Sequence, residues 1–162
     1  MVLVLMGVSG SGKTTVGRIL AEQLGWSFVE ADDYHPAANI EKMRRGTPLT
    51  DADRRPWLDA LRQRVDAACA RGENVVLACS ALKHAYQDYL ERDEPACVLY
   101  VHLKGSEELI RKRLAARKGH FMNPTLLHSQ FAIMEPPADA IEVDITPSPE
   151  AIAGEIRRKL GL

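Results

Sequence analysis

Short hydrophobic runs alternate with longer amphipathic segments along the whole chain. Five runs are rich in β-branched or aromatic residues and lack strict alternation, which is typical of strands covered on both faces. They are Val2–Met6, Trp26–Ala31, Asn74–Cys79, Cys97–Leu103 and Ile141–Ile145. The segments with helical periodicity are Gly12–Leu24, Asn39–Arg45, Asp53–Arg71, Lys83–Glu91, Ser106–Arg117 and Pro149–Leu160. This alternation predicts an α/β fold: a five-stranded parallel sheet with helices on both faces, in three layers.

Two stretches interrupt the periodic pattern, and loops carry binding and catalytic residues more often than regular elements do. The first is His35–Pro56, and the second is Lys118–Pro124 leading into Thr125–Met134. Since 162 residues fit one domain, we expect residues 1–162 to form a single unit. Function is then expected at these two stretches.

Charge and cysteine content exclude several classes of protein. The formal net charge is -1, from 21 basic and 22 acidic side chains, which argues against a nucleic-acid or membrane-surface binder held by bulk charge. Cys69, Cys79 and Cys97 are odd in number and widely spaced, so a disulfide framework or zinc site is not expected. The amino terminus lacks the basic segment of a signal peptide, and no apolar run is long enough to span a membrane. The sequence therefore predicts a cytoplasmic protein.

The segment after the first predicted strand matches G-x-x-x-x-G-K-[ST], from Gly7 to Thr14. In this motif the glycines let backbone N–H groups turn toward phosphate oxygens at the start of a helix. Lys13 is expected to reach the β- and γ-phosphates, and the Thr14 hydroxyl is expected to ligate Mg²⁺. The residues predicted to bind nucleotide here are Gly7, Ser9, Gly10, Ser11, Gly12, Lys13, Thr14 and Thr15.

Three classes of P-loop protein compete at this point. A GTPase would need D-x-x-G and N-K-x-D strings, and neither occurs in the sequence. A motor or AAA-type ATPase would have an apolar strand ending in Asp, whereas Val75–Cys79 is followed by Ser80-Ala81-Leu82-Lys83. A small-molecule kinase needs a phosphate cradle, an acceptor pocket with an acid, and a lid with cations, and all three can be found.

The acceptor pocket is predicted to begin at the end of the second strand, within a region spanning about residues 32–58. Ligands of open parallel sheets bind beyond the carboxyl ends of the strands, so Asp32 can accept or orient the proton of the acceptor hydroxyl. Glu30 is a candidate to reach Mg²⁺ through water. The alternative is that these acids only cap the next helix.

A cluster of cations follows in the same region and favours an anionic acceptor. Its members are Lys42, Arg44, Arg45, Arg54 and Arg55. The alternative for each is a solvated helix face. A lid is predicted over about residues 117–134, and Arg113, just before it, shares a helix face with Arg117. Arg117 can neutralise charge on the transferred phosphoryl group, Gly119 offers a hinge, and a solvated basic helix end is the alternative.

Taken in order, these segments resemble the gluconate kinases of the P-loop kinase superfamily. The segments are Met6–Lys13, Asp32 with His35-Pro36, Asn39–Met43, Gly46–Leu49 continuing into Asp51, Asp53, Arg54, Pro56, Trp57 and Leu58, then Cys79–Lys83 and Arg113–Phe121. The resemblance covers essentially the whole chain. Three segments separate this family from the related shikimate and adenylate kinases: Arg54-x-Pro56-Trp57-Leu58, Cys79–Lys83 and Arg117–Phe121.

The resemblance implies an adenylate-kinase-like fold and transfer of the ATP γ-phosphoryl group to the 6-hydroxyl of D-gluconate, in gluconate degradation. It also implies a Mg²⁺ requirement and a cytoplasmic homodimer. By similarity, Asp32 meets the acceptor hydroxyl, Arg54 binds the substrate carboxylate, and Lys83 lines the acceptor pocket. Arg113 and the Asp144–Pro147 loop would lie against adenine, with Lys13, Asp32 and Arg117 as catalytic residues. The expected substrate-binding residues are Asp32, His35, Lys42, Arg45, Arg54, Lys83, His120 and Gln130.

One local departure concerns the second strand, where some members of that family have Asp-Gly-Asp and this chain has Glu30-Ala31-Asp32. Two alternatives stay open from the sequence. One is a kinase for another small carboxylated acceptor such as shikimate, and the other is a regulator that binds ATP and transfers nothing.

Overall fold

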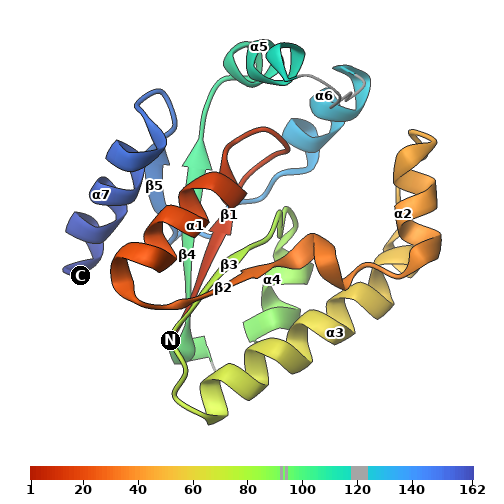
Figure 1. Cartoon of the computed structure of the whole chain (residues 1–162). Helices are drawn as coiled ribbons and strands as arrows, with labels where there is room; N and C mark the ends of the chain where they lie inside the picture. The colour runs from red at the N-terminus through yellow and green to blue at the C-terminus, as the bar shows by residue number, and fades with distance from the viewer. Residues whose placement is uncertain (92, 94, 118–123) are drawn as a thin grey trace.

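The computed structural model describes residues 1–91, 93, 95–117 and 124–162. Its strands form one parallel sheet in the order β2-β3-β1-β4-β5 (Figure 1). The strands are β1 (Val2–Met6), β2 (Ser27–Glu30), β3 (Val75–Ala78), β4 (Val98–Lys104) and β5 (Ile141–Asp144). The predicted five-stranded parallel sheet is therefore confirmed, with each strand within one residue of its expected ends.

Seven helices and two short 3₁₀ segments are seen in the described residues. They are α1 (Lys13–Leu24), η1 (Ala31–Tyr34), α2 (Ala37–Arg44), α3 (Asp51–Ala70), α4 (His84–Glu91), η2 (Pro95–Cys97), α5 (Glu107–Ala116), α6 (Pro124–Ile133) and α7 (Pro149–Leu160). Helix α6 corrects the expectation of an irregular stretch at 125–134. Its apolar side chains do not follow one stripe of helical spacing, so the sequence carried no amphipathic signal there.

The helices cover the sheet on both sides, which confirms the three layers. One core packs the sheet against α1, α5 and α7, with Leu20, Ile110 and Ile156 fully buried. The other packs it against α3 and α4, with Leu61 and Leu90 at its centre. Helix α2 stands away from the sheet at the far end of α3 (Figure 1). No helix among the described residues is long and apolar enough to cross a membrane.

Helix α3 begins earlier than the sequence pattern suggested because of a capping box. The Thr50 hydroxyl accepts from the Asp53 backbone N–H at 3.1 Å, and the Asp53 carboxylate accepts from the Thr50 N–H at 2.9 Å. Two N–H groups at the helix start are thereby satisfied. As a result Asp51 lies in the first turn of the helix rather than in the preceding loop.

The expectation that no disulfide forms is wrong for one pair of cysteines. Cys69, near the end of α3, is bonded to Cys97 in η2, with Cα atoms 6.0 Å apart. The end of α3 therefore lies close to the segment that leads into β4, a proximity that the spacing along the chain does not reveal. Cys79 is a buried free thiol, and burial raises its pKa to about 12.

We expect reduction of this disulfide to lower the free energy of unfolding by about 2–4 kcal/mol, because the cross-link closes a long loop in the unfolded chain. Urea denaturation with and without dithiothreitol measures the difference. A Cys69→Ser/Cys97→Ser variant serves as the control and should not respond to the reductant. Equal unfolding free energies for the wild type under both conditions would show that the bond contributes nothing.

Candidate active site

The phosphate loop joins β1 to α1 and is packed tightly against α5. Gly10 has φ +80°, a conformation that favours glycine, and a Cβ there would lie 2.9 Å from the Leu114 side chain. The Lys13 ammonium group donates to the carbonyl oxygens of Gly7 at 2.9 Å and Val8 at 3.0 Å. The Ser11 hydroxyl oxygen is buried without a hydrogen-bond partner in the described part of the chain. A phosphate oxygen would give it one.

Lys13 shares its electrostatic surroundings with the other expected catalytic residues. Burial lowers the pKa of its ammonium group, while Asp32 and Glu30 act in the opposite direction. Arg117 adds a smaller lowering effect through its like charge. Charges from separate parts of the chain, those of Glu30, Asp32 and Arg117, therefore act on the Lys13 ammonium group.

The Thr14 hydroxyl at the start of α1 and the Glu30 carboxylate at the end of β2 lie together beside the phosphate loop. The Thr14 hydroxyl donates to the Glu30 carboxylate at 2.5 Å. Hydroxyl and carboxylate oxygens suit Mg²⁺, which keeps several of its waters when bound to protein. These residues fit the ion that the sequence predicted, with Thr14 able to hold it directly and Glu30 through water.

Asp32 lies in η1 immediately beyond β2 and is exposed, with 74% of its side chain accessible. Its neighbour His35 is buried and stacks on the Trp57 indole, with ring centroids 4.7 Å apart. The Trp57 N–H donates to the Ala31 carbonyl at 2.7 Å, which fixes η1 to α3. Burial lowers the pKa of His35. The structure places His35 as a packing residue whose Nε2 lies 3.9 Å from the Asp32 carboxylate.

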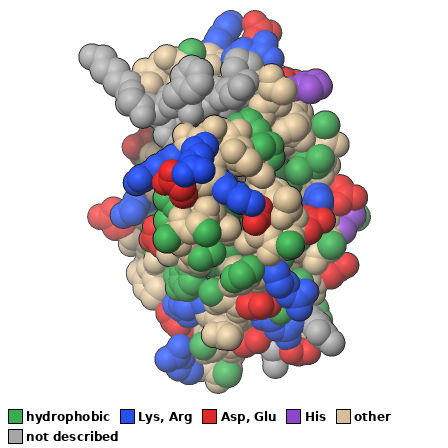
Figure 2. All heavy atoms as spheres, turned by 90° about the vertical axis from the view of Figure 1, so that its right-hand side faces the viewer, with side chains coloured by type: hydrophobic (Ala, Val, Ile, Leu, Met, Phe, Trp, Pro, Cys, Tyr) green, Lys and Arg blue, Asp and Glu red, His purple; other side chains and the backbone are tan. Residues whose placement is uncertain are grey.

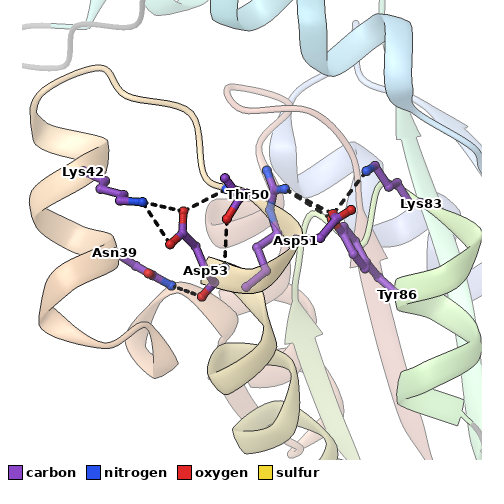
Figure 3. Close-up of polar contacts among 8 residues, drawn as sticks. Asn39, Lys42, Thr50, Asp51, Asp53, Lys83 and Tyr86 are labelled. Atoms are coloured by element: carbon purple, nitrogen blue, oxygen red, sulfur yellow. Dashed lines mark hydrogen bonds and ion pairs between the residues drawn. The ribbon is translucent and has the colours of Figure 1, made fainter.

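Lys83 and Tyr86 meet Asp51 at the start of α3 (Figure 3). Arg54 joins the same group of side chains, and sequence reasoning did not single out Tyr86. The Lys83 ammonium group donates to the Asp51 carboxylate at 3.2 Å. The Tyr86 hydroxyl donates to the same carboxylate oxygen. Arg54 donates to the Tyr86 hydroxyl at 3.2 Å. Two cations from distant parts of the chain are thereby held side by side.

Lys42 and Arg45 both have acidic partners. Lys42 donates to both oxygens of the Asp53 carboxylate, at 2.9 and 2.8 Å, and this holds the pKa of Asp53 down at about 2. Arg45 pairs with Glu41 on an exposed face of α2 at 3.1 Å. Figure 2, which looks at the side of the molecule that carries α2, shows basic and acidic side chains interspersed. Two members of the expected basic cluster, Lys42 and Arg45, are therefore each paired with an acidic residue.

The residues expected at the nucleotide base are joined to one another. Arg113, in the last turn of α5, donates to the Ile145 carbonyl. In the same loop, Asp144 accepts from the N–H of Thr146 at 2.9 Å and from its hydroxyl at 2.7 Å. Pro147 follows in this bend. Arg113 and the 144–147 loop thus form one structural unit at the edge of the sheet.

Gln130 in α6 contacts the phosphate loop across a long stretch of sequence. Its side-chain oxygen accepts from the Ser9 N–H at 2.8 Å, and its amide nitrogen donates to the Ser9 hydroxyl at 3.2 Å. The remaining lid residue of the expected substrate set, His120, lies outside the described residues, as does the hinge candidate Gly119. Gln130 is therefore the described lid residue with a defined contact to the site.

We expect Gln130→Ala to raise the KM for ATP about five- to tenfold, because two hydrogen bonds that order the phosphate loop are lost. The KM for the acceptor should be unchanged, and steady-state kinetics with each substrate varied measures both. Ser129→Ala removes only a bond within α6, to the Leu126 carbonyl, and is the matched control. A rise confined to the acceptor KM would instead assign Gln130 to substrate binding.

Sequence reasoning missed the role of Tyr86 and the strained backbone of Ala81, both in the segment that follows β3. Tyr86 follows Lys83 by three residues, a spacing that puts two side chains on one helix face and could have drawn attention to it. Ala81 has φ +39°, a strained value for a residue with a Cβ. It is held by Gln87, whose amide donates to the carbonyls of Ala81 and Glu135. No sequence signal indicates this strain.

Comparison with known proteins connects this site to a family. A family model described as an AAA domain matches residues 2–132. A probable gluconokinase from Xenopus tropicalis is 49% identical, covering 100% of this chain and 96% of its own length. The gluconokinase of Gluconobacter oxydans is 47% identical over 96% of this chain and 89% of its own.

Solved structures show the same similarity to gluconokinases. The crystal structure of a gluconokinase from Sinorhizobium meliloti 1021 superposes with a TM-score of 0.88 and 42% identity, covering 98% of this chain and 90% of that one. Shikimate kinase from Aquifex aeolicus, at 20% identity and a TM-score of 0.65, shares the fold. The phosphate loop therefore stands in a chain that is similar to gluconokinases along nearly its whole length. This chain belongs to the gluconokinase family, and it is a kinase.

Proposed function

We propose that the chain transfers the γ-phosphoryl group of ATP to the 6-hydroxyl of D-gluconate, giving 6-phospho-D-gluconate and ADP. The observation that carries this proposal is the 47–49% identity to gluconokinases over nearly the whole chain. That similarity includes the acceptor region and the lid as well as the phosphate loop. A shared fold alone would support only phosphoryl transfer to some acceptor.

In this proposal the phosphate loop and Lys13 hold the phosphates of ATP. Arg113 and Pro147 lie against the adenine, and Arg117 neutralises charge on the phosphoryl group as it moves. Thr14 would hold Mg²⁺, with Glu30 reaching it through water, and the ion would neutralise negative charge on the phosphates. The buried Ser11 hydroxyl and the Thr14–Glu30 pair support this arrangement.

At the acceptor end, Arg54 and Lys83 bind the gluconate carboxylate, and Asp32 orients the 6-hydroxyl for in-line attack and takes its proton. The exposure of Asp32 and its shared surroundings with Lys13 support that role. The contact between Arg54, Lys83 and Asp51 shows that these cations already hold a carboxylate. A cytoplasmic location stays a prediction from the sequence and the resemblance. A homodimer stays a prediction from the resemblance alone, and light scattering of the purified protein tests it.

The test of this proposal is the structure of the product. The purified protein is incubated with ATP, Mg²⁺ and D-gluconate, and the product is examined by two-dimensional ¹H–³¹P NMR. The proposal expects the phosphorus signal to couple to the two protons on C6. Coupling to a proton on any other carbon, or no phosphorylated acid at all, would contradict it.

A further inference from the structure

The side chain that joins Arg54 and Lys83 is Asp51, in the first turn of α3 (Figure 3). Its Oδ1 atom accepts from Lys83 at 3.2 Å and from the Tyr86 hydroxyl, and it lies 3.9 Å from the Arg54 guanidinium. These contacts converge on one of the two carboxylate oxygens. An ionised carboxylate has about four lone-pair sites, so Asp51 has acceptor capacity left on Oδ2.

Asp51 differs in this respect from Asp53, two residues later. Asp53 accepts from Lys42 with both oxygens and from the Thr50 N–H, and only 20% of its side chain is exposed. Asp51 is 70% exposed. The hydrogen bonds from Tyr86 and Lys83 lower its pKa, so near neutral pH it is an acceptor only.

The cluster therefore offers two cations beside one carboxylate whose Oδ2 atom accepts no hydrogen bond from the residues that the structure describes. A sugar acid presents the complementary pattern, a carboxylate beside a carbon that carries a hydroxyl. We propose that Asp51 accepts a hydrogen bond from the hydroxyl on the carbon next to the acceptor's carboxylate, while Arg54 and Lys83 bind that carboxylate. Asp51 then determines specificity for 2-hydroxy acids. This rests on the proposed function, which takes gluconate as the acceptor.

The same helix supplies a matched control for a purely structural role. Asp59, two turns further along α3, accepts from the Tyr89 hydroxyl of α4 at 2.5 Å and forms an ion pair with Arg55 at 3.2 Å. It repeats the contact of a carboxylate, a tyrosine and an arginine between α3 and α4, away from Lys83. Loss of Asp59 therefore removes the same type of interhelical contact without touching the acceptor cluster.

The experiment compares kcat/KM for D-gluconate and 2-deoxy-D-gluconate, which lacks only the hydroxyl in question. We expect the wild type to prefer gluconate by about 10- to 100-fold, since a site built to bind a hydroxyl rejects the analogue without it. Asp51→Ala should reduce this preference to about threefold or less. Asp59→Ala should keep the wild-type preference. Any loss of Arg54 or Lys83 orientation affects both acceptors alike, so the ratio isolates the hydroxyl contact.

Asp51→Asn keeps the side-chain volume and should lose most of the preference, because a neutral hydrogen bond is about half as strong as a charge-assisted one. It carries the same test if Asp51→Ala does not fold. A wild type without the preference, or variants that lower both rates by one factor, would overturn the role of Asp51. A wild type that does not phosphorylate gluconate would instead overturn the proposed function.

Discussion

Replacing Lys13 with alanine is expected to lower kcat by at least about 10²- to 10³-fold. The ammonium group is held over the phosphate loop by the Gly7 and Val8 carbonyls, where it can bridge the β- and γ-phosphates. Removing a preorganised charge that stabilises a phosphoryl-transfer transition state typically lowers kcat by a factor of this size. Initial rates of ADP release with saturating gluconate and ATP measure the loss.

Arg18→Ala is the control for this variant. Arg18 lies on the exposed outer side of the same helix, with its guanidinium group over the Phe28 ring at 5.0 Å. Its removal takes one positive charge from α1 without changing the loop and should leave kcat close to the wild-type value. Near-normal turnover by Lys13→Ala would contradict a catalytic role for Lys13 and the phosphate loop.

The second large effect is expected for Asp32→Asn, which should lower kcat by roughly 10²- to 10⁴-fold, the usual contribution of a positioned acid or base. An amide cannot take the proton of the acceptor hydroxyl. Binding of ATP should be largely kept, because the loop that holds the phosphates is separate from η1. Single-turnover rates and the dissociation constant for ATP measure the two quantities separately.

Asp33→Asn changes the neighbouring exposed carboxylate of η1 and is the matched control, with an effect on kcat expected to stay below about threefold. If Asp32→Asn lost ATP affinity in the presence of Mg²⁺ but kept kcat at saturation, Asp32 would belong to the metal shell. In that case another group would have to take the proton.

Local signals in the sequence predicted most of the fold. Runs such as Val2–Met6 are buried on both faces in the centre of the sheet, and their composition follows directly from that position. The missed features depend on tertiary contacts. Helix α6 has no apolar stripe, and the Cys69–Cys97 bond joins segments that only the folded sheet brings together.

The site also has a part that the sequence predicted and a part that depends on tertiary contacts. Lys13, Thr14 and Asp32 follow from a motif and from the rule that ligands bind beyond the ends of parallel strands. The partner of each charge does not follow from spacing. Whether Lys42 faces Asp53, or Gln130 faces Ser9, depends on how α2 and α6 pack. The sequence assigned Lys42 to the acceptor site because of the surrounding cations, and Gln130 by resemblance alone.

The central claim, that this kinase acts on gluconate, is tested most directly by the acceptor dependence of ADP release. The purified protein is assayed with ATP and Mg²⁺ in the presence of gluconate, other aldonates, shikimate, AMP or no acceptor. The account predicts a strong rate with gluconate and little or none with shikimate, AMP or water. A higher rate with shikimate or AMP would contradict the proposed substrate, and ATP binding without any acceptor-dependent rate would contradict phosphoryl transfer itself.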